Sequence, residues 1–118
     1  MDLMRMSERD YWAEVAKRPA MFLGRTTLTG LEGYLFGYDA HAHRHGGLGL
    51  DGWTDWLVAR MGRECNHGWN GKVRHLALGD KWESWELPAD QEQQVIKVLF
   101  DLLDEFLAER EMKGTRTR

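Results

Sequence analysis

Cysteine, proline and long apolar runs are scarce in this chain, and the scarcity excludes several classes of protein. The single cysteine, Cys65, cannot form an internal disulfide, so a disulfide-stapled secreted scaffold is excluded. No apolar run approaches the roughly 18 residues that a membrane span needs. Residues 1–6 lack the apolar core of a signal peptide. We therefore expect a cytoplasmic protein that does not bind membranes.

A large excess of charge of one sign is also absent, but the charges are unevenly distributed. The chain has 16 basic and 19 acidic residues, a formal net charge of −3. Residues 113–118 contain basic side chains and no acid, so residues 1–112 are more acidic than the whole chain. An acidic body matches a basic protein surface better than a phosphate backbone. We expect a single domain over residues 1–112, a basic flexible tail over residues 113–118, and no nucleic-acid partner.

Apolar residues at helical spacing predict an all-α fold, a compact bundle of about five helices. Ser7 is placed to cap the first helix, which should end before Pro19 because proline disfavours helical geometry in the preceding residue. Residues 21–23 are expected to form an extended plug between helices. Thr29 and Glu32 match a capping box, which predicts the start of the second helix.

Glycines mark one face of this second helix. Gly30, Gly33 and Gly37 fall at helical spacing, and each lowers helix propensity by about 1 kcal/mol relative to alanine. Two interpretations account for them. The glycines either allow close approach of a neighbouring helix or of tryptophan rings, or they form a groove for a partner.

The second half of the chain contains the clearest helix and the most ambiguous segment. Asp51 is expected to cap a third helix that ends near Gly62. Residues 69–78 favour a helix, and a short hairpin between residues 72 and 87 is the alternative. Asp90 is expected to cap the last helix, whose apolar residues cover more than half of its circumference. Such a helix must pack against two or more neighbours, or against one neighbour and a second subunit. A homodimer through the last helix is therefore an alternative.

Histidine and cysteine residues form one pattern that could bind a metal. His41 and His45 share a helix face at the spacing used by zinc sites, and Cys65 and His67 would have to fold back onto them. Histidines near a helix C-terminus are also favoured by the helix dipole alone. We expect no metal or cofactor, with this four-residue set as the alternative: a metal-binding enzyme or sensor.

Catalytic signatures are missing from the sequence. Cys65 with His67 or His75 forms a cysteine–histidine pair without an evident third group to orient it. The glycine-rich stretch 46–49 lacks the lysine and the preceding strand of a phosphate-binding loop. We therefore expect a binding protein rather than an enzyme.

Six tryptophans are many for 118 residues. Tryptophan is enriched at interface hot spots, and acidic neighbours would select a basic partner. The alternative is that the rings pack against the bundle and the acids form a solvated face. The residues that we expect to bind a partner are Trp82, Glu83, Trp85 and Glu86, supported on the last helix by Asp101, Asp104 and Glu105.

Two resemblances bear on function. Residues 18–24, Arg-Pro-Ala-Met-Phe-Leu-Gly, resemble a segment near the start of GHKL ATPases. That family also needs an Asn after its acidic residue and an Asp-x-Gly-x-Gly turn. No matching Asn follows Glu32, and Asp80 is followed by Lys81 and Trp82, so ATP binding is rejected.

Over most of its length the chain is similar to a group of small bacterial proteins. Their shared plan appears here in residues 18–24, 31–38, 53–69 and 100–107, and the stretch 81–88 departs from it. Some of these proteins look like immunity partners in toxin systems. The resemblance implies an immunity or antitoxin-like protein that neutralises a bacterial toxin by covering its basic surface.

Overall fold

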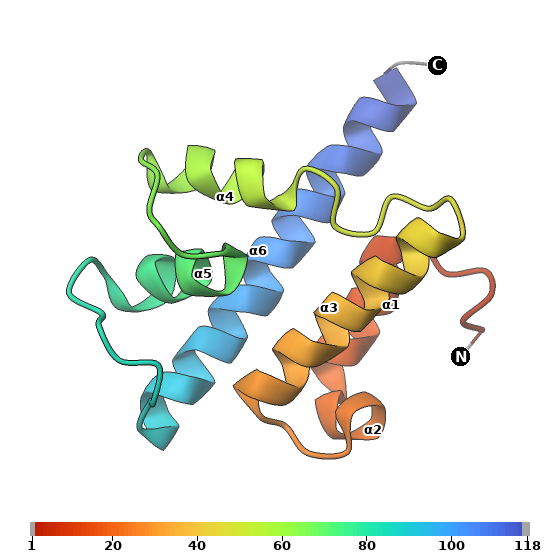
Figure 1. Cartoon of the computed structure of the whole chain (residues 1–118). Helices are drawn as coiled ribbons and strands as arrows, with labels where there is room; N and C mark the ends of the chain where they lie inside the picture. Colours follow the sequence, from red (N-terminus) through yellow and green to blue (C-terminus); the bar gives the residue numbers. More distant parts are fainter. Residues whose placement is uncertain (1, 117–118) are drawn as a thin grey trace.

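A computed structural model describes residues 2–116 of the chain, which are all-helical with no strand in that range. The predicted all-α fold is confirmed (Figure 1). The hairpin alternative is absent from the described residues, because residues 72–78 belong to a helix and residues 82–87 have no regular structure. The helices are α1 (Glu8–Lys17), α2 (Pro19–Leu23), α3 (Leu28–Arg44), α4 (Trp53–Met61), α5 (Trp69–Leu78) and α6 (Ala89–Arg116).

The long helix α6 lies at the centre of the bundle. Figure 1 shows α1, α2 and α3 on one side of it and α4 and α5 on the other. Helices α1, α3 and α5 pack directly against α6, and α4 reaches it through Trp53 and Trp56, whose rings contact Phe106. Several neighbours within one chain therefore cover the wide apolar arc of α6. Its buried residues are Val95, Ile96, Leu99, Leu102, Leu103, Phe106 and Leu107.

The start of the chain confirms one prediction and corrects another. Ser7 caps α1 by accepting a hydrogen bond from the Asp10 backbone N–H at 3.1 Å, and the helix ends at Lys17 as expected. The extended plug was wrong, because residues 19–23 form the short helix α2. Proline is favoured at the first position of a helix, where its fixed φ fits and its missing N–H has no partner to lose. Gly24, with φ of 78°, ends the turn.

Three predicted helix caps lie at other residues. Helix α3 begins at Leu28 because the Thr27 hydroxyl, and not that of Thr29, accepts the N–H of Gly30 at 3.0 Å. Helix α4 begins after Gly52, which adopts a left-handed conformation, and no side chain caps it. Helix α6 begins at Ala89, so Asp90 lies inside its first turn. Glu32 and Asp51 are thereby left for other contacts.

The glycine face of α3 does not pack closely against another element. A Cβ atom added at Gly33 or Gly37 would meet no atom within 4 Å, and at Gly30 it would meet mainly the Thr27 side chain. The expected close approach of a helix or of tryptophan rings is therefore wrong. The glycines lie on an exposed face of α3.

An aromatic cluster fills the space between α1, α2 and α3. Trp12 is almost fully buried, and its ring contacts those of Tyr11, Tyr34 and Tyr38 edge to face. Phe22 of α2 packs against Tyr11 in the same way. We call these five residues the N-terminal aromatic cluster. Its hydroxyls are paired, Tyr11 with Tyr34 and Tyr38 with the Glu8 carboxylate.

The end of the chain lies partly outside the described residues. Helix α6 continues to Arg116, so its backbone includes part of the expected tail over 113–118. The remainder of that tail, residues 117–118, lies outside the described residues. No helix among residues 2–116 combines the length and apolar character needed to cross a membrane.

Candidate functional site

The segment from Gly62 to Leu87 folds back on itself and brings the chemically active side chains together. Helix α5 forms as predicted, with Val73 buried and Leu76 partly buried against the core. Gly62, in a left-handed conformation, ends α4 and starts the loop that leads to α5. The chain after α5 then brings Trp82 against His75 and Trp85 against His67 before α6 begins.

A buried lysine holds the first loop against α5. Lys72 is 3% exposed, and its ammonium donates hydrogen bonds to the carbonyl oxygens of Cys65, at 3.4 Å, and of His67. It also forms an ion pair with Glu64 at 2.8 Å. Three oxygen acceptors match the three protons of the ammonium, which compensates for its burial. The pair lowers the pKa of the Glu64 carboxyl, mainly through the hydrogen bond to Lys72. This anchoring sets the positions of the Cys65 and His67 side chains.

A buried ion pair joins α5 to α3. The Arg74 guanidinium binds both carboxylate oxygens of Glu32, at 2.8 and 2.9 Å, and also donates to the Asn70 carbonyl oxygen. Both charged side chains are less than a tenth exposed. The guanidinium carbon lies 4.7 Å from the ring centroid of Trp85, so a cation–π contact links the pair to the returning chain. Sequence analysis missed this pair because Glu32 was assigned to a capping box.

Two histidines and two tryptophans pack beside this pair. The ring centroid of Trp82 lies 5.1 Å from that of His75 and 5.2 Å from that of His67, and Trp85 lies 5.5 Å from His67. Together with Cys65 we call these residues the imidazole–indole cluster. The Trp82 indole N–H donates to the Ser84 carbonyl oxygen at 2.6 Å. The Nδ1 atoms of both histidines are buried and have no hydrogen-bond partner among the described residues.

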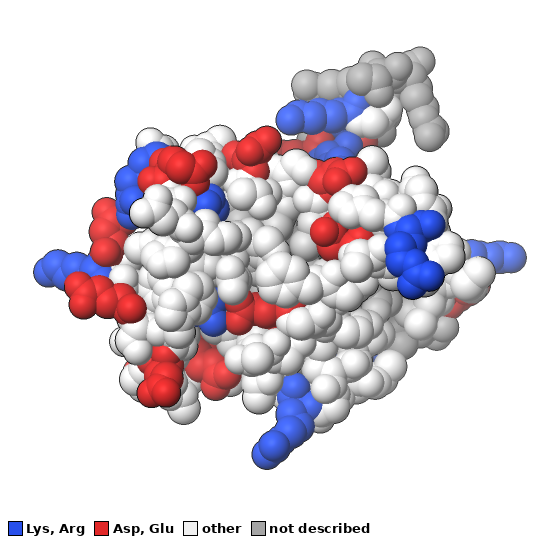
Figure 2. Space-filling model, viewed as in Figure 1, with Lys and Arg blue, Asp and Glu red and all other residues white. Residues whose placement is uncertain are grey.

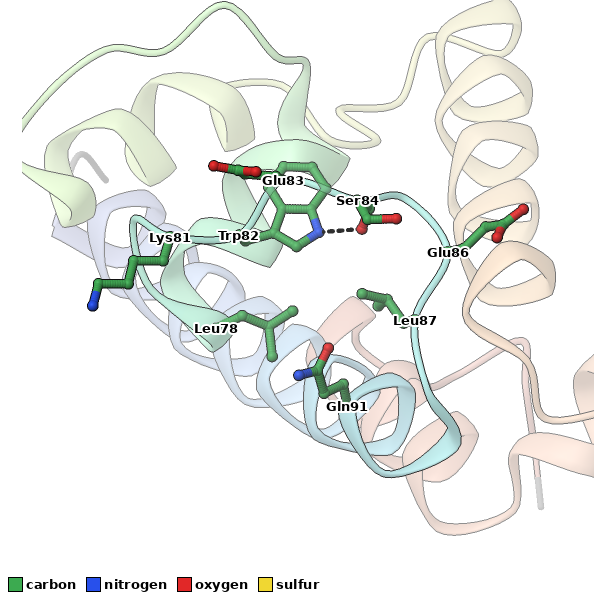
Figure 3. A pocket seen from close by; sticks show the side chains of 8 residues that line it. All are labelled: Leu78, Lys81, Trp82, Glu83, Ser84, Glu86, Leu87 and Gln91. Atoms are coloured by element: carbon green, nitrogen blue, oxygen red, sulfur yellow. Dashed lines mark hydrogen bonds between the residues drawn. The ribbon is translucent and has the colours of Figure 1, made fainter.

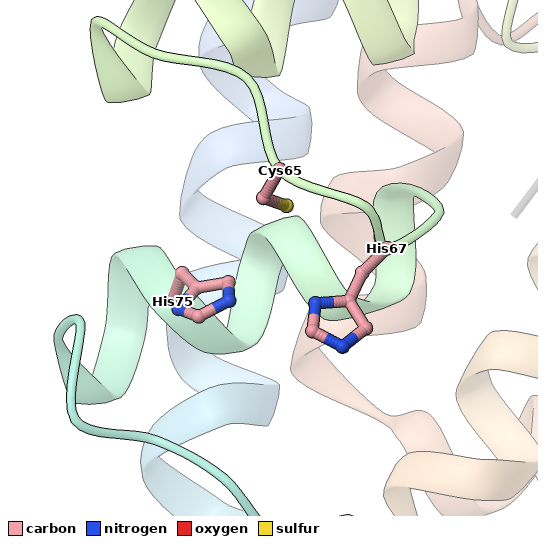
Figure 4. Close-up of side chains that lie close together, drawn as sticks. All are labelled: Cys65, His67 and His75. Carbon is pink, nitrogen blue, oxygen red and sulfur yellow. The ribbon is translucent and has the colours of Figure 1, made fainter.

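Cys65, His67 and His75 converge within this cluster. Their ligand atoms all lie within 4.8 Å of one another, and each residue is partly buried. Figure 4 shows Cys65 and His67 reaching over from the loop toward His75 on α5. Among residues 2–116, these three residues are the one group whose potential metal-binding atoms come this close together. His41 and His45 do not belong to it. The structure therefore joins two members of the predicted set, Cys65 and His67, to His75.

The histidines at the end of α3 have other contacts. The rings of His41 and His45 lie 4.4 Å apart. His43 Nε2 lies 2.7 Å from the Asp51 carboxylate, and its Nδ1 lies 3.6 Å from that of Asp39. The hydrogen bond with Asp51 raises the pKa of His43 above its ordinary value. Asp51 precedes Gly52, the cap residue of α4, and its carboxylate contacts His43.

The predicted partner-binding tryptophans differ in exposure. Trp82 is 9% exposed and Trp85 is 48% exposed, so only Trp85 presents a large surface to solvent. Glu83 and Glu86 are exposed and form no ion pair with a described residue. A pocket of about 330 Å³ lies beside them, with the Trp82 ring facing it and Glu86 pointing outward (Figure 3). Its lining residues are Leu78, Lys81, Trp82, Glu83, Ser84, Glu86, Leu87 and Gln91.

The predicted acidic residues of α6 already have partners within the chain. Asp104 accepts two hydrogen bonds from Arg9, at 2.9 and 3.1 Å, and Glu105 pairs with Arg60. Asp101 pairs with Lys97 at 3.1 Å. Glu83 and Glu86 line a pocket together with Gln91, and the helical rise places Asp101 about 15 Å farther along α6. These three acids therefore do not join Glu83 and Glu86 in one patch. Figure 2 likewise shows acidic and basic side chains interspersed over the visible face.

No protein-family model matches this chain, and neither a curated protein nor a solved structure does.

Proposed function

We propose that this chain is a non-catalytic protein-binding module that binds a basic partner through its segment 83–86. Its most concrete form is an immunity or antitoxin-like protein that covers the basic surface of a bacterial toxin. The observation that carries the proposal is the exposed pair Glu83 and Glu86 on either side of the half-exposed Trp85. Neither carboxylate has a cation partner among the described residues.

This arrangement has the features of an interface hot spot. A large aromatic ring supplies contact area with little loss of side-chain entropy, and carboxylates beside it attract cationic side chains. One contact of the Trp85 ring is already made by Arg74, which is held by Glu32, so the indole is positioned before a partner arrives. Preorganisation of this kind lowers the entropic cost of association. The pocket next to Glu83 and Glu86 offers room for one basic side chain of the partner.

The acids of α6 have a smaller part in this proposal than the sequence predicted. Asp104 and Glu105 are each paired with an arginine of α1 or α4, so a partner cation would have to displace that arginine. The apolar arc that suggested a homodimer is covered by helices of the same chain. The proposal therefore assigns the interface to residues 83–86 and needs no second copy, which predicts a monomeric mass in light scattering.

A toxicity-rescue experiment tests the proposal. The product of the neighbouring gene is expressed alone and together with this chain, and growth is compared. We expect that product to be toxic alone, and co-expression to restore growth. The double variant Glu83→Gln/Glu86→Gln should lose the rescue. Asp101→Asn/Glu105→Gln, which removes the same charge from α6, should retain it.

Binding measurements on the same variants test whether Glu83 and Glu86 form the interface. Binding of the purified neighbour protein is measured by calorimetry at low and high salt. A loss of affinity confined to the Glu83 and Glu86 variant, together with weaker binding at high salt, supports the proposed interface. Equal affinity in all variants, or no complex with a basic neighbour protein at either salt concentration, would contradict it.

A further inference from the structure

The imidazole–indole cluster contains a set of ligands with no assigned role in protein binding. Cys65 supplies a thiol, and His67 and His75 supply imidazoles, all within 4.8 Å of one another. Buried imidazole nitrogens are normally hydrogen-bonded, and an unpaired one is destabilising. Here the Nδ1 atoms of both histidines are buried and unpaired among the described residues. The same two histidines supply the imidazole nitrogens that lie near the thiol, so converging ligand atoms and unpaired nitrogens occur on the same side chains.

We propose that Cys65, His67 and His75 bind one divalent transition-metal ion, with zinc as the favoured metal. Thiolate and imidazole are the ligands that zinc takes most often, and hard cations such as magnesium and calcium prefer oxygen. Three protein ligands leave a fourth tetrahedral position for water. The site is separate from the exposed carboxylates of residues 83–86, and the proposal does not rest on partner binding.

The distances are close to those of a zinc site. Bonds of about 2.0–2.3 Å in a tetrahedron place the ligand atoms roughly 3.3–3.8 Å apart. The ligand atoms lie within 4.8 Å of one another, and a rotation of the Cys65 side chain can shorten the separation of its sulfur from the imidazoles. Cys65 lies in the loop before α5, so its side chain can rotate without any change in a helix.

The surroundings support the three ligands. Lys72 anchors the backbone of Cys65 and His67 through their carbonyl oxygens, the kind of outer-shell support that zinc ligands have in proteins. Trp82 and Trp85 pack against the imidazole rings and limit their rotation. Gly71 leaves room for His67, because a Cβ at this position would lie 2.3 Å from the His67 Cβ.

The nearby positive charges do not prevent cation binding, because each has a carboxylate partner. Lys72 is paired with Glu64 at 2.8 Å, and Arg74 with Glu32 at 2.8 Å. The Lys72 ammonium is directed toward oxygen acceptors of the loop. A thiolate at Cys65 would contribute one negative charge to the site, which further favours a divalent cation.

Cobalt(II) substitution tests the proposal on the full chain after treatment with a chelator. We expect one equivalent of cobalt to produce a thiolate-to-metal charge-transfer band and the intense visible bands of tetrahedral coordination. Zinc should then displace the cobalt. Competition with a chromophoric chelator gives the zinc affinity. Absence of the charge-transfer band in the wild-type protein would overturn the proposal.

Matched variants identify the ligands. Cys65→Ser and His75→Asn should each weaken zinc binding by roughly 100-fold or more, because even outer-shell changes weaken it 10- to 100-fold. The control His41→Asn/His45→Asn should bind zinc as the wild type does. If this control abolished binding while His75→Asn retained it, the site would be the one that the sequence suggested, and the present assignment would be wrong.

A thiol-protection assay keeps the test valid if a variant fails to fold. The wild-type chain has one cysteine, so its alkylation rate reports Cys65 alone. One equivalent of zinc should slow alkylation at neutral pH, and acidification should release the metal because the ligands bind in deprotonated form. An alkylation rate unchanged by zinc would overturn the proposal without any variant.

Discussion

The molecule contains two aromatic clusters that differ in how their polar atoms are satisfied. In the N-terminal aromatic cluster, the hydroxyls of Tyr11, Tyr34 and Tyr38 all have partners within the described residues, and the Trp12 indole N–H is the buried polar group without one. In the imidazole–indole cluster, two buried imidazole nitrogens have none, and Trp85 is half exposed. The first cluster has the composition of a stabilising core. The second has exposed surface and two unpaired imidazole nitrogens, which can act as ligands, and these are the features expected of a binding site.

The two regions also differ in the ionisation of their polar side chains. Burial, followed by the hydrogen bond with Glu8, raises the pKa of Tyr38 to about 12, and burial raises the pKa of Tyr11. Both tyrosines are therefore neutral at physiological pH. Next to the imidazole–indole cluster, two buried charged residues are paired, Arg74 with Glu32 and Lys72 with Glu64. Stability in the first region comes mainly from apolar burial, and the second depends on specific charge pairs.

The largest expected effect comes from the same truncation made in each cluster. Trp12→Ala should lower the free energy of unfolding by about 3–5 kcal/mol, because it removes a buried ring from a core. Trp85→Ala should cost about 1–2 kcal/mol, since half of this ring is already in water. Urea unfolding followed by circular dichroism measures both. Equal losses would contradict the proposed difference between the clusters.

Breaking the buried ion pair should have the next largest effect. Glu32→Ala leaves the Arg74 guanidinium buried without its carboxylate, and we expect a loss of about 3 kcal/mol in the free energy of unfolding. The control Glu32→Leu/Arg74→Met removes both charges and should be much closer to the wild type. If both variants lost the same stability in urea unfolding, lost packing and not the unpaired charge would be the cause.

Replacing a glycine by alanine should lower the stability of the protein in α5 and raise it in α3. Gly71→Ala should destabilise the protein by about 1–3 kcal/mol, because the new methyl group forces His67 to move. Gly33→Ala, on the exposed face of α3 with no atom near its Cβ, should stabilise by up to about 1 kcal/mol through helix propensity. Thermal unfolding of the two variants provides the measurement. Stabilisation by Gly71→Ala would show that His67 is not held against α5.

The smallest effect concerns alkaline pH and the N-terminal aromatic cluster. Tyr38 has a pKa near 10 when unfolded and about 12 when folded, so the unfolded chain loses its proton first. Stability should therefore be fully present below about pH 10 and should decrease as the pH rises toward about 12. Unfolding curves at about pH 9 and about pH 11 test this direction. Tyr38→Phe should weaken the dependence, and a stability that rises over this range would exclude the proposed cause.

Local sequence signals predicted which segments are helical more accurately than they predicted the residue at which each helix begins. The Ser7 cap, the end of α1 before Pro19 and the left-handed Gly62 follow from interactions within a few residues. The capping-box pattern predicted Thr29 as the cap of α3, and Thr27 is the residue that caps it. Glu32 is drawn inward by Arg74, so it cannot complete a capping box. A tertiary contact, the ion pair with Arg74, therefore decided the role of Glu32.

The candidate sites were predicted only in part. Exposed Glu83, Trp85 and Glu86 lie where aromatic and acidic residues suggested, but the burial of Trp82 and the pairing of Asp104 with Arg9 depend on neighbours remote in sequence. His75 was noted beside Cys65 only as a catalytic pair. Its place with Cys65 and His67 depends on how the loop folds over α5, which Lys72 controls.

The sequence by itself determined an all-helical chain with a long apolar central helix, because helix formation and amphipathic spacing are local properties. Only the tertiary structure decided which polar groups meet. Glu32 and Arg74 are 42 positions apart, and Arg9 and Asp104 are 95 apart. The partner of a charged side chain depends on which helices become neighbours, and no local pattern specifies that. The same physical reason applies to Cys65, His67 and His75, whose convergence requires the loop and α5 to be folded together.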